Sequence, residues 1–135
     1  MGIKKIIDLA TLTGACQIAL GTDYAGLFSN NDQLSKELLK AAKISGEKLW
    51  PLPMPEEYKI LNKSEIADIK NIPSIKDGGA STAALFLQEF IKEDVIWSHW
   101  DIASPAYAEK PMNNYILAGG VGFGVRTLLE WLLEF

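Results

Sequence analysis

Side chains able to bind a metal ion are few and scattered in this sequence. A zinc site takes three or four ligands, yet the chain has one histidine, His99, and one cysteine, Cys16. A carboxylate-only site for Mn²⁺ or Mg²⁺ would have to draw on aspartates spread along the chain. These residues are Asp8, Asp23, Asp68, Asp77 and Asp101. No two of them are separated by a spacing typical of metal ligands. The spacing alone therefore supports no metal site.

Nucleophilic catalysis would depend on His99, the only histidine available as a base. His99 lies beside Trp97 and Trp100 in an apolar run, which is more typical of a core histidine with satisfied hydrogen bonds than of an exposed base. No G-x-S-x-G nucleophile motif occurs in the chain. The residues therefore do not favour a Ser-His-Asp or Cys-His site.

A glycine-rich stretch at residues 119–124 is the candidate for a phosphate-binding loop. A G-x-G-x-x-G motif would need glycine at position 125, where Val125 stands, and no Walker G-K-[ST] sequence occurs. A nucleotide-binding domain is therefore the weakest hypothesis. A tight turn into the last helix is favoured.

The loop at residues 11–15 is the best candidate for contact with a ligand. Thr11, Thr13 and Gly14 supply two hydroxyl groups and an approachable backbone. The loop also follows a predicted strand, and ligands of open α/β sheets usually bind at the carboxyl ends of strands. The residues predict a contact here without specifying the ligand.

Strand and helix patterns alternate along the chain and would position this loop. Short apolar runs predict strands, and apolar residues at helical spacing predict helices. Asn30 or Asn31 caps the second helix, and Gly46 ends it. Strands are expected at residues 3–9, 24–29 and 95–102, a strand or ordered loop at 66–72, and helices at 15–20, 32–45, 55–62, 80–91 and 125–135. The predicted fold class is α/β.

Composition narrows the class of protein. The 135 residues include 13 Lys and Arg against 17 Asp and Glu, which gives a net charge of −4, and 48% are hydrophobic. This length suits one domain with a sizeable core. One cysteine excludes an internal disulfide framework, and the acidic balance argues against nucleic acid or an anionic membrane as partner. We expect a soluble, cytoplasmic domain without a transmembrane helix.

Five motifs also occur in the order found in one known family. The sequence IDLATLTGA at residues 7–15 is followed by ADIKNI at 67–72, similar to a D-x-x-N-I loop. GASTAALFL at 79–87 is similar to a G-A-x-T-A-A-x-F-L helix. WSHWDIA at 97–103 and GVRTL at 124–128 are similar to W-x-H-x-D-I-A and G-x-R-T-L. Together they resemble the leucyl (cytosol) aminopeptidase family over essentially the whole chain.

The resemblance implies a two-metal exopeptidase that removes N-terminal residues, leucine prominently, from peptides. Two divalent cations, zinc or manganese, would bind the free amine and the scissile carbonyl and generate hydroxide. In the family, the metal ligands include the acidic pair of the signature N-T-D-A-E-G-R, which lies upstream of the segment that resembles residues 7–15. The 135 residues contain no copy of this signature. We therefore expect the chain to carry no catalytic residue and to bind no catalytic metal.

The resemblance implies that several residues of this sequence line the substrate pocket. Thr11, Leu12 and Gly14 would line the site, with the backbone of Leu12 and Gly14 in contact with the substrate. Ala103 would border the pocket for the N-terminal side chain, and Ile72 would border the next subsite. Plain core packing is the competing interpretation of Ile72 and Ala103.

Two hypotheses describe the chain as a whole. In the first, residues 1–135 are the C-terminal portion of such a catalytic domain, without its metal-binding segment, and carry part of a mixed, largely parallel sheet flanked by helices. The fragment would then be inactive alone. In the second, the chain is a stand-alone, non-catalytic binding or assembly domain on the same scaffold. The family implies a homohexamer, and an unpaired strand at residues 3–9 would favour self-association.

Overall fold

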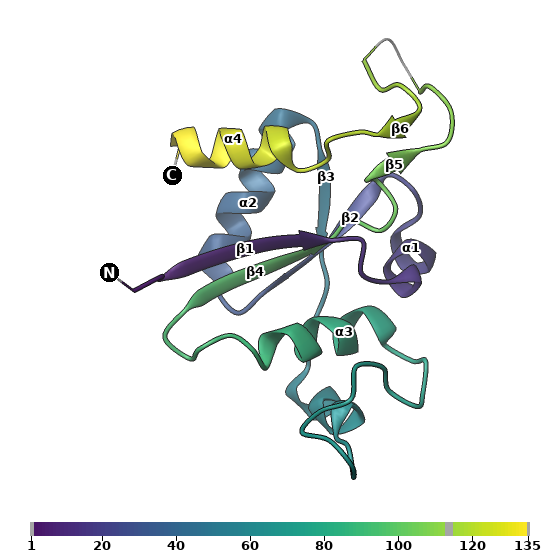
Figure 1. Ribbon diagram of the computed structural model, residues 1–135. Helices are drawn as coiled ribbons and strands as arrows, with labels where there is room; N and C mark the ends of the chain where they lie inside the picture. Colours follow the sequence, from purple (N-terminus) through teal and green to yellow (C-terminus); the bar gives the residue numbers. More distant parts are fainter. Residues whose placement is uncertain (1, 113–114, 135) are drawn as a thin grey trace.

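The computed structural model describes residues 2–112 and 115–134, and Figure 1 traces their course. The main sheet has four strands in the spatial order β1 (Lys5–Ala10), β4 (Ile96–Asp101), β2 (Tyr24–Ser29) and β3 (Lys48–Pro51). β1 is parallel to β4 and β2 is parallel to β3, whereas β2 and β4 are antiparallel. The expected mixed, largely parallel sheet is confirmed.

Helices cover both faces of this sheet (Figure 1). α2 (Asp32–Ser45) and α4 (Val125–Glu134) pack on one face, and α1 (Gly14–Leu20) and α3 (Gly79–Gln88) pack on the other. Alternation along β2 produces the two layers, because Ala25 and Leu27 join the core beneath α2 while Phe28 joins the core beneath α1 and α3. The predicted α/β class is therefore correct, and so is the expectation that helices flank the sheet.

Local signals at the ends of α2 act as the sequence predicts. The side chain of Asn31 accepts a hydrogen bond from the backbone N–H of Leu34 at 2.8 Å, which caps α2. Gly46 ends α2 in the left-handed conformation. Thr13 caps α1 in the same way as Asn31, by accepting from the N–H of Cys16.

Several segments differ from the expected elements. The predicted helix at 55–62 is a 3₁₀ helix, η1 (Glu56–Asn62), preceded by Pro55, and the helix expected to reach residue 91 ends at Gln88. Residues 66–72 form no strand. β5 (Tyr107–Ala108) and β6 (Gly119–Gly120) form a two-stranded sheet that the sequence patterns do not predict, because two paired residues leave no alternating pattern to detect. Phe135, the expected last residue of α4, lies outside the described residues.

The start of α4 is tied to the sheet by a buried carboxylate. Glu47 accepts hydrogen bonds from the N–H of Gly124 at 3.0 Å and from the N–H and hydroxyl of Thr127 at 2.9 and 2.7 Å. Gly124 also needs its missing side chain, since a Cβ there would lie 2.5 Å from Cδ2 of Leu9. The glycine-rich stretch thus includes a tight turn into α4, as predicted.

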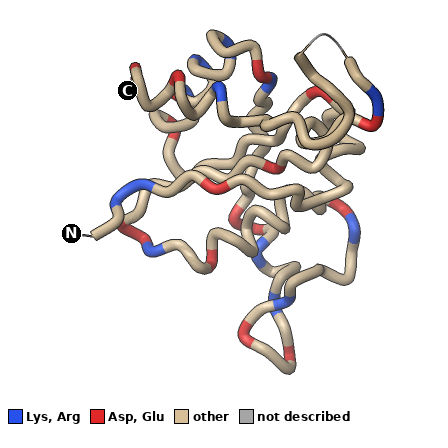
Figure 2. Tube along the Cα trace, turned by 45° about the horizontal axis from the view of Figure 1, so that its top comes forward, with Lys and Arg blue, Asp and Glu red and all other residues tan. Residues whose placement is uncertain are grey.

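Charges are dispersed along the described chain. Figure 2 shows Lys and Arg interspersed with Asp and Glu along the trace. No helix within the described ranges has both the length and the apolar character needed to cross a membrane.

Candidate functional site

The carboxyl ends of β1 and β4 meet at one edge of the sheet. The two strands are parallel, and Ala10 is paired with Asp101 at their ends. The loop at residues 11–13 and the segment that begins at Ile102 therefore leave the sheet side by side. This edge is the position at which open α/β sheets usually bind ligands.

One buried carboxylate, that of Asp101, joins the two segments. Its Oδ1 accepts hydrogen bonds from the backbone N–H groups of Leu12 at 3.1 Å, Thr13 at 3.3 Å and Ala103 at 3.2 Å. Its Oδ2 accepts from the hydroxyl of Thr13 at 2.6 Å. The loop before α1 and the segment after β4 thus share a single acceptor group.

The sequence did not single out Asp101 for this role. It marked Asp101 only as one of several scattered aspartates. The available signal was a carboxylate at the end of a predicted strand, next to a motif that leads into Ala103. Such a position suits an acceptor for backbone N–H groups that leave the sheet.

Cys16 lies beneath this network and is buried. Its thiol donates to the backbone oxygen of Asp101 at an S–O distance of 3.8 Å. Burial, followed by the negative charge of Asp101, raises the pKa of the Cys16 thiol to about 11. Cys16 is therefore a protonated packing residue at neutral pH.

The predicted pocket residues fall into two groups. Thr11 and Gly14 are exposed, and Leu12 and Ala103 are half-buried, at the edge organised by Asp101. Ile72 belongs to a different segment, the loop between η1 and α3, and its side chain is 82% exposed. The interpretation of Ile72 as a core residue is wrong, because the loop carries it away from both apolar clusters.

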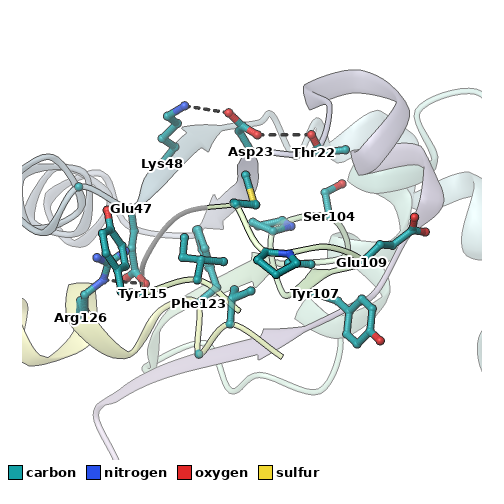
Figure 3. A pocket seen from close by; sticks show the side chains of 18 of the residues that line it. Thr22, Asp23, Glu47, Lys48, Ser104, Tyr107, Glu109, Tyr115, Phe123 and Arg126 are labelled. Atoms are coloured by element: carbon teal, nitrogen blue, oxygen red, sulfur yellow. Dashed lines mark hydrogen bonds and ion pairs between the residues drawn. The ribbon is translucent and has the colours of Figure 1, made fainter. Parts of the chain in front are cut away.

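A cavity of about 1170 Å³ opens beside the segment after β4, where Figure 3 labels Ser104. Its wall includes Ala103 and Ser104 after β4, and Glu47, Lys48 and Arg126 from the segments around β3 and α4. Lys48 forms an ion pair with Asp23 at 2.9 Å, and its hydrogen bond and charge lower the pKa of the Asp23 carboxyl. Of the predicted pocket residues, Ala103 lines this cavity, whereas Thr11, Leu12 and Gly14 do not.

His99 is a core residue, as the sequence predicts. It is fully buried, with its Nδ1 2.5 Å from Oδ1 of Asp8, and its ring stacks near those of Phe28 and Trp97. Its Nε2 has no hydrogen-bond partner among the described residues, so only one of its two ring nitrogens is satisfied. A fully buried ring is not an exposed base.

Within residues 2–112 and 115–134, no group of three or more His, Cys, Asp and Glu side chains is arranged to hold a metal ion. Asp101 and Glu47 direct their oxygens at backbone N–H groups and hydroxyls.

Comparison with known proteins identifies the family. A family model described as the cytosol aminopeptidase family, catalytic domain, matches residues 1–129. The chain belongs to the cytosol aminopeptidase family. The resemblance predicted from the five motifs is thereby confirmed.

Curated relatives of this aminopeptidase-family chain are much longer. A probable cytosol aminopeptidase of Cyanothece sp. is 53% identical over 133 residues, which cover 98% of this chain and 26% of that protein. The neutral chloroplastic leucine aminopeptidase of Solanum lycopersicum is 50% identical, over 98% of this chain and 22% of its own length. The chain thus spans about a quarter of the length of the curated relatives that it matches.

Solved structures that are similar to this chain share its fold. A mutant of tomato leucine aminopeptidase has a TM-score of 0.88 at 47% identity, over 98% of this chain and 25% of that one. The bottromycin maturation enzyme BotP, in complex with Mn, has a TM-score of 0.88 at 40% identity, over 93% of this chain and 28% of that one. The sheet and helices described above are therefore an aminopeptidase-domain architecture.

Proposed function

We propose that this chain supplies part of the substrate pocket of a metal-dependent aminopeptidase that releases N-terminal residues such as leucine from peptides. The observation that carries the proposal is the convergence of residues 11–14 and Ala103 at the carboxyl edge of β1 and β4. These two segments are far apart in the sequence and belong to two of the five motifs. Membership of a peptidase family supports a peptide as the ligand.

Each pocket residue has a distinct part in the proposal. The backbone groups of Leu12 and Gly14 contact the substrate main chain beside Thr11. Ala103 borders the pocket for the N-terminal side chain of the substrate. Its own side chain is small and lies beside the cavity, which leaves room for a larger substrate side chain. Ile72, which is exposed, borders the next subsite.

We also propose that the two divalent cations, zinc or manganese, bind outside these 135 residues. The lack of a metal-ligand cluster in the described part of the chain supports this assignment, as does the missing N-T-D-A-E-G-R signature. The related enzyme BotP has been solved with Mn. The chain alone is then inactive, and residues 1–135 form the C-terminal portion of a larger catalytic domain.

We further propose that the complete enzyme is a homohexamer and that it is located in the cytoplasm. The Cyanothece relative is named a cytosol aminopeptidase, whereas the tomato relative is chloroplastic, so names within the family cover two compartments.

Hydrolysis of leucine p-nitroanilide with added Mn²⁺ or Zn²⁺ tests the proposal. We expect no turnover by the 135-residue chain. We expect turnover by a chimera in which this chain replaces the matching 26% of the Cyanothece aminopeptidase. Robust turnover by the chain alone would contradict the assignment of the metal ions to other residues. A folded, metal-loaded but inactive chimera would contradict the pocket assignment and favour a stand-alone binding or assembly domain.

A further inference from the structure

We propose that Asp101 is the positioning residue of this pocket, whose single carboxylate holds both of its walls in register. The inference rests on the proposed function, because it assigns Asp101 a role through Leu12, Gly14 and Ala103. Asp101 itself does not need to touch the substrate.

The hydrogen bonds of the Asp101 side chain connect the loop at residues 11–13 with the segment that follows β4. Leu12 and Asp101 are 89 positions apart, yet the N–H of Leu12 and the N–H of Ala103 donate to the same oxygen, Oδ1. A shift of either segment would lengthen its own hydrogen bond to that shared atom. The carboxylate therefore couples the position of one wall to that of the other.

Burial makes these hydrogen bonds costly to lose. Asp101 is 1% exposed, and no ion pair with a cation is formed by it within the described chain. Its charge is compensated by backbone N–H groups and by the hydroxyl of Thr13. Hydrogen bonds to a charged group are stronger than neutral ones, so the native loop geometry is preferred over a loosened one.

The network also sets the start of α1. The hydroxyl of Thr13 donates to Oδ2 of Asp101 at 2.6 Å and accepts from the N–H of Cys16 at 3.0 Å. Asp101 thereby orients the capping hydroxyl, which in turn fixes the first turn of α1. Gly14 is the first residue of α1, so the Thr13 cap fixes its position. Leu12 is held by its own hydrogen bond to Asp101.

The backbone atoms proposed to contact the substrate are thus placed by Asp101 on both sides of Thr13. Catalytic rates are sensitive to such placement, since a misplacement of about 1 Å can cost about 100-fold in rate. Replacement of Asp101 should therefore lower activity without removing any group that contacts the substrate.

The test combines two variants that break the network with a rescue variant and a matched control. Asp101→Asn removes the charge at nearly constant shape, and Thr13→Val removes only the hydroxyl, which gives a milder change if Asp101→Asn folds poorly. Thr13→Ser retains the hydroxyl and should rescue the loss. Asp94→Asn is the control, because Asp94 is exposed and forms an ion pair with Lys4 at the surface, away from Asp101.

Amide hydrogen exchange measured on the 135-residue chain reports the positioning directly. We expect exchange at Leu12 and Ala103 to accelerate at least about tenfold in Asp101→Asn, and exchange at Leu12 to accelerate in Thr13→Val. Amides of β2, such as that of Leu27, should keep their protection in both variants. Unchanged exchange at Leu12 and Ala103 in Asp101→Asn would overturn the proposal.

Kinetics of the chimera report the consequence for the pocket. We expect kcat/KM for leucine p-nitroanilide to fall about 10- to 100-fold in Asp101→Asn and Thr13→Val, with recovery in Thr13→Ser and no change in Asp94→Asn. Faster exchange with unaltered kinetics would overturn the role in the pocket. An inactive parent chimera would instead refute the proposed function, while the exchange data would still decide whether Asp101 holds the two segments.

Discussion

Two buried carboxylates, Asp101 and Glu47, organise the turns of this protein at the level of single residues. Both are compensated chiefly by backbone N–H groups and hydroxyls. Arg126 forms an ion pair with Glu47, but its Nε is 3.6 Å away and its side chain is half exposed, so this pair contributes little. Each carboxylate therefore caps a turn: Asp101 where β1 and β4 end, and Glu47 at the start of α4.

Burial, and secondly the charge of Asp101, raise the pKa of the neighbouring Cys16 thiol. The folded protein holds the pKa of the Cys16 thiol at about 11, against an ordinary value of 9.0. The folded state therefore keeps its proton where the unfolded state loses it. The stability that this group contributes is complete below pH 9 and is lost as the pH rises from about 9 to about 11.

We predict that the wild-type chain loses stability relative to Cys16→Ala over that pH window. Urea unfolding at pH 8, 9, 10 and 11 would measure the free energy of unfolding of both proteins. The difference between them isolates the thiol from the tyrosines and lysines that titrate in the same range. A difference that stays constant from pH 8 to pH 11 would contradict the raised pKa.

At the scale of elements, local signals were enough to predict the helices that begin and end with a cap. α2 has its cap at Asn31 and its stop at Gly46 within or next to the segment itself, and its buried residues recur at helical spacing. β2 was predicted with correct bounds because its apolar run is short and bounded by turn residues. These features depend on neighbours in the sequence, which is why the sequence alone could supply them.

Features that depend on distant partners could not be predicted in this way. The antiparallel pairing of β2 with β4 brings Phe28 opposite His99, and no local pattern specifies that choice. The role of Asp101 likewise depends on N–H groups 89 and 88 positions away. The candidate loop at residues 11–15 was found from the sequence, but the group that positions it was not.

The turn into α4 gives a prediction at this scale. Gly124 has φ of +93°, and a Cβ there would lie 2.5 Å from Cδ2 of Leu9, so Gly124→Ala must strain the backbone and shift the Leu9 side chain. We expect a loss of about 2–4 kcal/mol in the free energy of unfolding, measured in urea. Gly120→Ala is the matched control, because nothing lies within 4 Å of its added Cβ, and it should change stability by less than about 0.5 kcal/mol. Equal losses in the two variants would contradict this explanation.

At the scale of the whole molecule, apolar surface remains uncovered around α4 and β1. Val125, Leu129, Leu132 and Leu133 form an exposed stripe along α4, although the sequence pattern of that helix resembles a core-facing one. The buried side of α4 is instead formed by Thr127, with Leu128 and Trp131 partly buried against the core. Exposed apolar surface of this kind is typical of an interface.

β1 adds an open backbone edge to this surface, since it is the last strand of the main sheet. Ile96 and Ile102 of the β4 segment donate to the carbonyls of Lys4 and Ala10, so alternation directs the N–H groups of Ile7 and Leu9 away from β4. The opposite edge is better protected, because β3 is short and ends in Pro51.

We therefore predict that the 135-residue chain self-associates through β1. A partner strand would pair with the outward N–H groups of Ile7 and Leu9, so exchange of these two amides should slow as protein concentration rises. Amides in the exposed loop before α3, such as that of Ile72, serve as the internal control and should not respond. Sedimentation equilibrium should show an average mass that increases with concentration over the same range. A monomer at every concentration, with unchanged exchange at Ile7 and Leu9, would mean that the open edge of β1 does not pair between copies of this chain.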